Sequence, residues 1–261
     1  MTAVWPDGAE LPDPNVPERA AFRAVRCLPG EIAPNVLVPG DPARAARIAK
    51  EWLTDAKLVM VQREFHSYTG EYEGVPVSVI STGVGSPGAA MVMQDLAKLG
   101  CDVVVRVGTA GSCIEAVKPG DNVIGTAAVR DEGLTRKFVP EIYPAVANLE
   151  VTNALCGAAA KQETEFHTGV VHTSDSFRSP ALENDIEISI YAGVLAFEME
   201  AATVLTMAAL SRMRAGCIFS IDGYVVNVAG GNVVPDVDAR NRGIKSAIRS
   251  SLDAIVSLAK T

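Results

Sequence analysis

The amino-acid sequence predicts an α/β fold in which strands and helices alternate along one large domain. Two observations support this prediction. Short runs of β-branched and other apolar residues alternate with longer stretches in which apolar residues recur at helical spacing. The 261 residues, of which 48% are hydrophobic and 21% charged, suffice for a sizeable core. No internal repeat or low-complexity segment divides the chain, so we expect a single layered domain.

Each expected element has a local signal in the sequence. Buried apolar runs predict strands over residues 36–38, 57–61, 68–73, 75–81, 102–107, 121–129, 167–173 and 216–221. Helical spacing predicts helices over residues 42–53, 88–99, 150–161, 200–213 and 240–259. Asp41 caps the first helix and Pro42 takes its first position, where a missing N–H costs nothing. Glu73-Gly74 is the expected hairpin turn between two strands, and residues 130–147 are expected to form a long functional loop.

Composition narrows the class of protein. Five scattered cysteines without a Cys-x-x-Cys pair favour reduced thiols in the cytoplasm over a disulfide framework. A net charge of −8 argues against general nucleic-acid binding, which needs a basic face. No apolar stretch reaches the ~20 residues of a membrane span, and the N-terminus lacks a secretory signal pattern. Residues 1–28 hold four prolines and are expected to form an irregular extension before a main domain over residues 29–261.

Arg106 is the most informative residue. It interrupts a β-branched run that is typical of a strand buried on both faces. An unpaired guanidinium in such a place is very costly, so something anionic must meet it. No acidic residue is adjacent, and the small residues 108–112 that follow are expected to form a turn with free backbone N–H groups. The pattern indicates a pocket for a bound anion, with a distant core carboxylate as the alternative.

Other candidates are weaker when taken singly. Arg44 falls in the first turn of a helix, where the macrodipole disfavours a cation unless an anion binds there. Arg63 alone reads as a surface charge. Glu200 precedes an apolar helix and needs hydrogen-bond donors, such as sugar hydroxyls, unless it is a structural cap. Asp222 follows a buried strand, where an aspartate can donate a proton if its pKa is raised, although an Asp-Gly turn explains it too. Phe177 is either core or a stacking surface for a ring.

A glycine-rich segment raises a different possibility. Residues 83–88 match the fingerprint of dinucleotide-binding folds, after a strand and before a helix. That fold needs an acidic residue at the end of the next strand, where this chain has Arg106. We therefore favour a glycine turn that lets backbone approach a ligand over an NAD site. His167 and His172 are expected on opposite faces of one strand, so no metal site is predicted.

Taken together, these residues resemble the nucleoside phosphorylase-I family, the group of purine nucleoside and uridine phosphorylases. The resemblance runs from about residue 28 to the C-terminus and rests on six motifs that occur in the family's order. They are Gly40-Asp41-Pro42-Ala43-Arg44, Arg63-Glu64-Phe65, Thr82-Gly83-Val84-Gly85, Arg106-Val107-Gly108-Thr109, Ser174-Asp175-Ser176-Phe177 and Glu198-Met199-Glu200. It implies a three-layer α/β/α fold around a twisted mixed sheet, assembled as a homo-oligomer of dimers, usually a hexamer. It implies no cofactor and no metal, with inorganic phosphate as co-substrate.

The resemblance also implies residue roles. Phosphate would be held by Gly40, Arg44, Arg106 and Thr109, with Arg63 reaching in from the neighbouring subunit. Ribose would be bound by Glu198, Met199 and Glu200, and the base by Gly111, Phe177 and Asp222. In catalysis Arg106 would position phosphate, Glu200 would fix the sugar, and Asp222 would donate a proton to the leaving base.

The base is less directly implied. Uridine-specific members carry a Gln-x-Arg pair shortly after the base-element aromatic, and residues 178–183 do not carry it. Purine-specific members carry an aspartate where this chain has Asp222. We therefore expect phosphorolysis of purine nucleosides to free base and (deoxy)ribose 1-phosphate. The alternatives are a uridine phosphorylase, a nucleosidase (hydrolase) of the same superfamily, and a non-catalytic nucleoside or phosphate sensor. Ala24 stands where family members usually carry a histidine for the 5′-hydroxyl, so contacts to the 5′ group are open.

Overall fold

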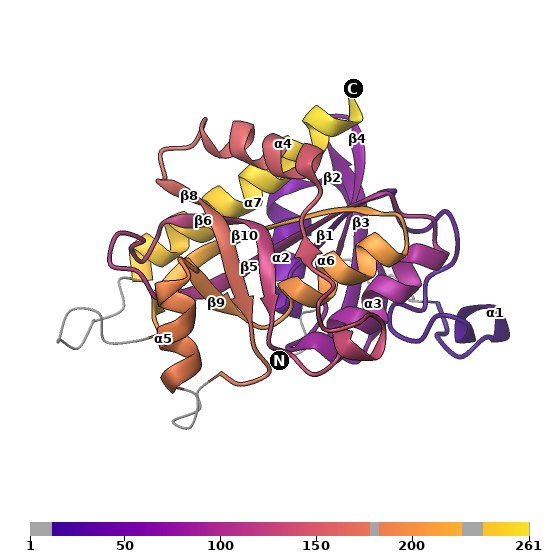
Figure 1. Cartoon of the computed structure of the whole chain (residues 1–261). Coiled ribbons are helices and arrows are strands. Elements are labelled where there is room, and N and C mark those ends of the chain that lie inside the picture. The colour runs from indigo at the N-terminus through magenta and orange to yellow at the C-terminus, as the bar shows by residue number, and fades with distance from the viewer. Residues whose placement is uncertain (1–11, 178–182, 226–236, 261) are drawn as a thin grey trace.

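The computed structural model describes residues 12–177, 183–225 and 237–260 (Figure 1). The helices are α1 (Pro17–Ala20), α2 (Pro42–Trp52), α3 (Ser86–Lys98), α4 (Leu149–Ala159), α5 (Glu183–Tyr191), α6 (Ala201–Leu210) and α7 (Val237–Ala259), with a 3-10 turn η1 (Thr135–Lys137). The strands are β1 (Asn35–Val38), β2 (Thr54–Gln62), β3 (Phe65–Tyr72), β4 (Val75–Ile80), β5 (Val103–Ser112), β6 (Asn122–Arg130), β7 (Ala145–Val146), β8 (Phe166–Thr173), β9 (Ala196–Glu198) and β10 (Arg214–Tyr224). No helix in this described part is long and apolar enough to cross a bilayer.

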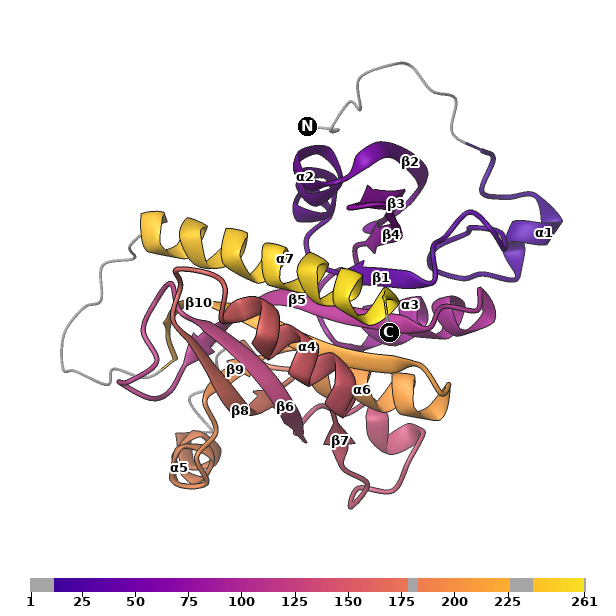
Figure 2. The ribbon, with the colours of Figure 1, turned by 90° about the horizontal axis from the view of Figure 1, so that it is seen from above.

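The strands form one mixed sheet. Its order is β10-β6-β8-β9-β5-β1-β4-β3-β2, with β7 paired to β6. A further pairing of β10 with β5 closes the first part of this path into a ring, while β1, β4, β3 and β2 extend from it as an open wing. Helices α2, α4 and α7 bury apolar side chains against one face, and α3 and α6 against the other. Figure 2 shows α7 and α6 on opposite sides of β5. The predicted α/β/α domain with a mixed central sheet is confirmed.

Strand β5 shows how side-chain alternation builds both layers. Val103, Val105 and Val107 pack with α2, α4 and α7, whereas Val104 packs with α3 and α6. Arg106 shares the parity of Val104 and therefore lies on the α3 and α6 face. The strand thus places one cation in the layer formed with α3 and α6.

The structure corrects the predicted ends of several elements. The sequence predicts a turn over residues 108–112, but these residues continue β5 because β10 pairs with them on one side and β9 on the other. Strand β10 likewise runs on to Tyr224, past an irregularity between Ile221 and Gly223 that leaves Asp222 unpaired with β5. Neither β9 nor α5 is expected from the sequence, since β9 is short and its partners are distant in the chain. The loop expected over residues 130–147 contains η1 and β7.

The described part of the N-terminal segment packs against the domain. Phe22, Ala24 and Val25 are buried in the core cluster that contains α3 and α6. The buried carboxylate of Asp95 on α3 accepts the backbone N–H groups of Ala24 and Val25, at 2.7 and 3.1 Å. Ala24 therefore lies inside its own subunit, and any contact to a substrate 5′ group must come from another residue.

Candidate active site

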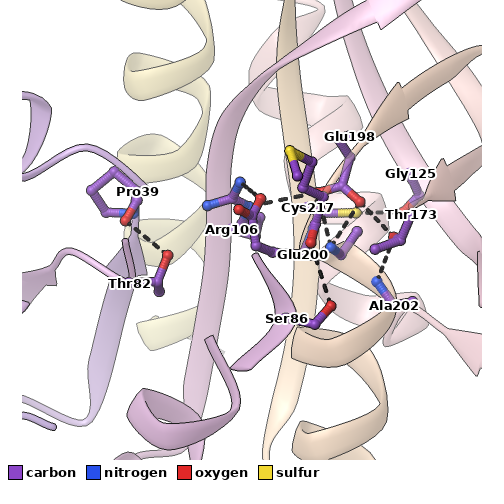
Figure 3. A network of polar contacts seen from close by, with 12 residues as sticks. Pro39, Thr82, Ser86, Arg106, Gly125, Thr173, Glu198, Glu200, Ala202 and Cys217 are labelled. Atoms are coloured by element: carbon purple, nitrogen blue, oxygen red, sulfur yellow. Dashed lines mark hydrogen bonds and ion pairs between the residues drawn. The ribbon is translucent and has the colours of Figure 1, made fainter. Parts of the chain in front are cut away.

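The site is built around the guanidinium of Arg106, which is only 4% exposed. Its Nη2 donates to the carboxylate of Glu200, and its Nε lies 3.9 Å from Glu198 Oε2 (Figure 3). The distant core carboxylate that the sequence left as an alternative is therefore present, 94 residues further along the chain. The buried Nε and Nη1 have no hydrogen-bond partner among the described residues. Burying such donors is costly, so Arg106 retains capacity for an additional anion.

Two backbone turns bring glycines against this guanidinium. The Gly83 N–H donates to the Gly40 carbonyl at 3.0 Å, which ties the end of β1 to the turn after β4. A Cβ on Gly40 would lie 3.2 Å from the Gly83 oxygen and 3.5 Å from Arg106 Nη1. Gly83 has a φ of +70°, and a Cβ there would lie 2.8 Å from Glu64 Cγ. The glycine at position 40 keeps the approach to Nη1 open, and the glycine at position 83 lets the turn pass close to Glu64.

Arg44 brings a second positive charge to the same region. It lies half-buried in the first turn of α2, which Asp41 caps by accepting the Ala43 N–H at 2.9 Å. Burial lowers the pKa of the Arg44 guanidinium, and the charge of Arg106 lowers it further. No described carboxylate lies within ion-pair distance of it. Two cations that destabilise each other beside a helix N-terminus form a site for an anion.

Glu198 and Glu200 enter the site from the start of α6 (Figure 3). Glu200 accepts the Gly85 N–H at 2.6 Å as well as Arg106 Nη2. Glu198 accepts the N–H groups of Glu200 and Ala201 at 2.8 and 2.9 Å, and Thr173 donates its hydroxyl to it. Burial raises the pKa of Glu198, against the opposing effect of Arg106. Glu198 therefore caps the start of α6 and holds the backbone of Glu200 in place. Because the carboxylate of Glu198 is occupied by these contacts within the protein, Glu200 is the better ligand for a sugar.

Asp222 lies on the β10 irregularity, near the cations. Burial raises the pKa of its carboxyl, while the charges of Arg240 and Arg44 act in the opposite direction. Arg240 Nη2 on α7 lies 3.9 Å from Asp222 Oδ2. Sequence reasoning missed Arg240, because an arginine in the first turns of an amphipathic helix carries no signal that it faces a strand 18 residues earlier. The raised pKa and the interrupted strand suit a proton donor, and the charge of Arg240 acts against the raised pKa.

Comparison with known proteins agrees with this geometry. The profile described as the phosphorylase superfamily matches residues 34–257. The chain belongs to this superfamily.

Similar proteins of known activity include nucleoside phosphorylases. The uridine phosphorylase of Thermococcus kodakarensis is 40% identical over 209 residues, covering 76% of this chain and 75% of the relative. The guanosine phosphorylase of Halorubrum lacusprofundi is 33% identical, covering 88% and 95%. The crystal structure of purine nucleoside phosphorylase from Toxoplasma gondii in complex with immucillin-H superposes with a TM-score of 0.85 at 28% identity, covering 92% of this chain and 96% of that one. The predicted enzyme class, a nucleoside phosphorylase and thus a pentosyltransferase, is confirmed.

Some of the residues that the superfamily motifs imply lie apart from the Arg106 cluster within one chain. Arg63 is exposed at the two-residue tip between β2 and β3, where its φ is +54°. Phe177 is 81% exposed, next to residues 178–182, which lie outside the described part. Thr109 and Met199 are half-buried. Gly111 is overlaid by Val225, whose Cγ1 would lie 3.0 Å from an added Cβ.

Proposed function

We propose that the chain catalyses the reversible phosphorolysis of purine nucleosides, giving free base and (deoxy)ribose 1-phosphate. One observation carries the proposal: Arg106 is buried, keeps two donors without a hydrogen-bond partner among the described residues, and shares its region with the half-buried Arg44. Inorganic phosphate is an oxyanion that such a pair recognises through charge-assisted hydrogen bonds. The assembly of the superfamily site around this pair supports phosphate as co-substrate.

The mechanism follows from the position of each group. Arg44 and Arg106 hold phosphate beneath the anomeric carbon, which lowers the entropic cost of attack. Glu200 binds the ribose hydroxyls, and the phosphate charge stabilises the sugar as it gains oxocarbenium character. Asp222, whose pKa is raised by burial, donates a proton to the purine ring nitrogen as the bond to the sugar breaks.

The second subunit belongs to the same proposal. Arg63 is exposed and has no described ion pair, so it is available to a neighbouring site. We place it on the phosphate of the partner in a dimer, and we propose a cytoplasmic oligomer, up to a hexamer, built from such dimers.

Uridine is the second candidate substrate. The relatives favour uridine, since those from Thermococcus kodakarensis, Haemophilus influenzae and Escherichia coli are uridine phosphorylases. Asp222 favours purine, because a carboxylic acid there has a ring nitrogen to protonate in a purine leaving group. Residues 178–183 lack the Gln-x-Arg pair that the family resemblance associates with uridine.

An assay of base release on inosine, guanosine and uridine, with and without phosphate, tests the proposal. We expect release from inosine and guanosine that depends on phosphate and yields ribose 1-phosphate. Release that continues undiminished without phosphate would identify a hydrolase. Strict preference for uridine would overturn the purine assignment while leaving phosphorolysis in place.

A further inference from the structure

A buried polar cluster lies beside the candidate active site and outside the motifs that define it. His172 on β8 is only 4% exposed, and both of its ring nitrogens are engaged. Nδ1 lies 2.9 Å from Ser189 Oγ on α5, and Nε2 lies 3.2 Å from Asp131 Oδ2, just after β6. The imidazole also stacks on Phe197 of β9, with ring centroids 4.4 Å apart. One side chain therefore fixes three other segments.

The partners determine the hydrogen-bonding pattern of this imidazole. An ionised carboxylate only accepts hydrogen bonds, so the Nε2 of His172 carries the proton and donates to Asp131. Nδ1 of the neutral ring is then an acceptor and receives the hydroxyl proton of Ser189. Asp131 is itself held in place, because its backbone N–H donates to the Thr173 carbonyl at 3.1 Å. Both ring nitrogens of His172 thus have protein partners among the described residues.

Strand register places the cluster next to the region where the base is expected. His172 pairs with Phe197, and Phe197 pairs in turn with Gly111 of β5. Gly111 pairs with Gly223, the residue after Asp222. Paired residues share one face of a sheet, so Phe197 lies between His172 and the strand that carries Asp222. Phe197 is half-exposed, although its neighbours on both sides in β9 are buried.

The same cluster connects to the segment that contains Phe177. This segment begins at Ser174, two residues after His172, and its Asp175 accepts the Gly133 N–H at 2.8 Å. Ser189 lies on α5, which is the next element along the chain. His172 thus joins Asp131, the start of the base segment and α5 into one rigid wall.

We propose that His172 is a positioning residue for base recognition, which fixes Phe197 and α5 as a wall of the base pocket without touching the substrate. The proposal rests on the proposed function. The ribose and phosphate side has a support of its own, because Glu198 accepts the N–H groups of Glu200 and Ala201 at the start of α6, and neither contact involves His172 or its partners. Loss of His172 is therefore expected to weaken recognition of the base more than binding of ribose or phosphate.

The chain contains a matched control on the same strand. His167, at the start of β8, pairs through Nε2 with Asp121 Oδ2 at 3.1 Å. Like His172, it is a histidine–aspartate pair on β8, but it lies at the opposite end of the strand from Thr173 and the base segment. His167→Phe and His172→Phe therefore make the same chemical change at two distances from the site.

The experiment compares KM and kcat for nucleoside and phosphate in the oligomer that each variant forms. His172→Phe retains an aromatic ring against Phe197 but loses both hydrogen bonds, and we expect the nucleoside KM to rise about tenfold. The phosphate KM is expected to stay within about twofold, and His167→Phe to match the wild type in both constants. Ser189→Ala, a smaller change, is expected to raise the nucleoside KM in the same direction and stands in if His172→Phe does not fold.

A spectroscopic measurement tests the cluster itself. In ¹⁵N-histidine spectra, with three histidines in the chain, His172 is expected to carry its proton on Nε2. In Asp131→Ala the Nε2 proton loses its acceptor, and the share of His172 that is protonated on Nδ1 is expected to rise. An unchanged nucleoside KM in His172→Phe and Ser189→Ala, or an equal rise in the phosphate KM, overturns the role of His172. A wild-type protein that is inactive on all nucleosides with phosphate overturns the proposed function, and this role with it.

Discussion

Glu200→Gln is expected to strengthen phosphate binding although Glu200 belongs to the nucleoside site. Its carboxylate bonds Arg106 Nη2 and accepts the Gly85 N–H, so it neutralises part of the charge that phosphate must use. Glutamine has nearly the same shape but no charge, and its amide satisfies only one of the two donors. Without phosphate, the variant leaves the buried Arg106 with less compensation than the wild type has.

The magnitude of the gain in phosphate affinity follows from the guanidinium of Arg106, which Glu200 and phosphate share. A carboxylate and a phosphate on opposite sides of one guanidinium are roughly 6 Å apart, and unit charges at that distance repel by about 3 kcal/mol at an effective dielectric of 20. Solvent entering the site reduces this, so we take about 1.5–3 kcal/mol, or about a 10- to 100-fold tighter phosphate Kd. The nucleoside kcat/KM is expected to fall by about 10²-fold or more, because an interaction with the sugar that strengthens in the transition state is lost.

Calorimetric titration with phosphate measures the effect, and thermal unfolding with and without phosphate checks it independently. The stabilisation by phosphate is expected to be larger in Glu200→Gln than in the wild type, because tighter binding adds more to the folded state. Glu132→Gln is the control: Glu132 is a fully buried carboxylate that caps residues 134 and 135, away from Arg106. It is expected to lose stability with an unchanged phosphate Kd. Equal or weaker phosphate binding by Glu200→Gln would refute the competition between carboxylate and phosphate.

Three further experiments test other parts of the site. Gly40→Ala places a methyl group 3.5 Å from Arg106 Nη1 and 3.2 Å from the Gly83 oxygen. The phosphate KM is therefore expected to rise about tenfold in steady-state kinetics. An unchanged phosphate KM would contradict an approach of phosphate by this route. Arg240→Gln removes a charge that lowers the pKa of Asp222, so this pKa rises further. The fall of kcat/KM at high pH is therefore expected to move to higher pH. A shift of this fall to lower pH would be inconsistent with Asp222 acting as an acid. Arg63→Ala and Arg106→Ala proteins are each expected to be nearly inactive. If Arg63 acts in the partner subunit, a mixed dimer of the two variants has one complete site. Activity that returns after the two variants are refolded together measures this.

Local signals in the sequence predicted local structure well. The Asp41-Pro42 helix start is confirmed by the capping bond to the Ala43 N–H, and Glu73-Gly74 does connect β3 and β4. Such features depend on a few adjacent residues, whose backbone preferences are fixed by their own chemistry. The burial of Arg106 was also predictable, because a β-branched run on both sides of a residue leaves it no route to solvent.

Long-range pairing was not predictable from one sequence. Residues 108–112 look like a turn because they are small, and only the arrival of β9 and β10 makes them a strand. The contacts of Arg106 with Glu200 and of Asp222 with Arg240 likewise depend on how the sheet closes. The His172 cluster combines residues from β8, α5 and the end of β6, and no spacing rule connects Asp131, His172 and Ser189.

The buried charges of the site explain why its residues belong together. Arg106, Glu198 and Glu200 would stabilise the fold more as apolar side chains, since the desolvation of buried ions usually outweighs their attraction. Their arrangement makes sense if partners exchange during turnover: phosphate takes over part of the charge of Arg106, and Glu200 is then free to bind the sugar. Gly40 keeps the approach open for that exchange, and Glu198 holds the start of α6 in place while it happens. The Arg106–Glu200 ion pair is thus proposed to exchange partners during turnover, with each of the two substrates replacing one half of it.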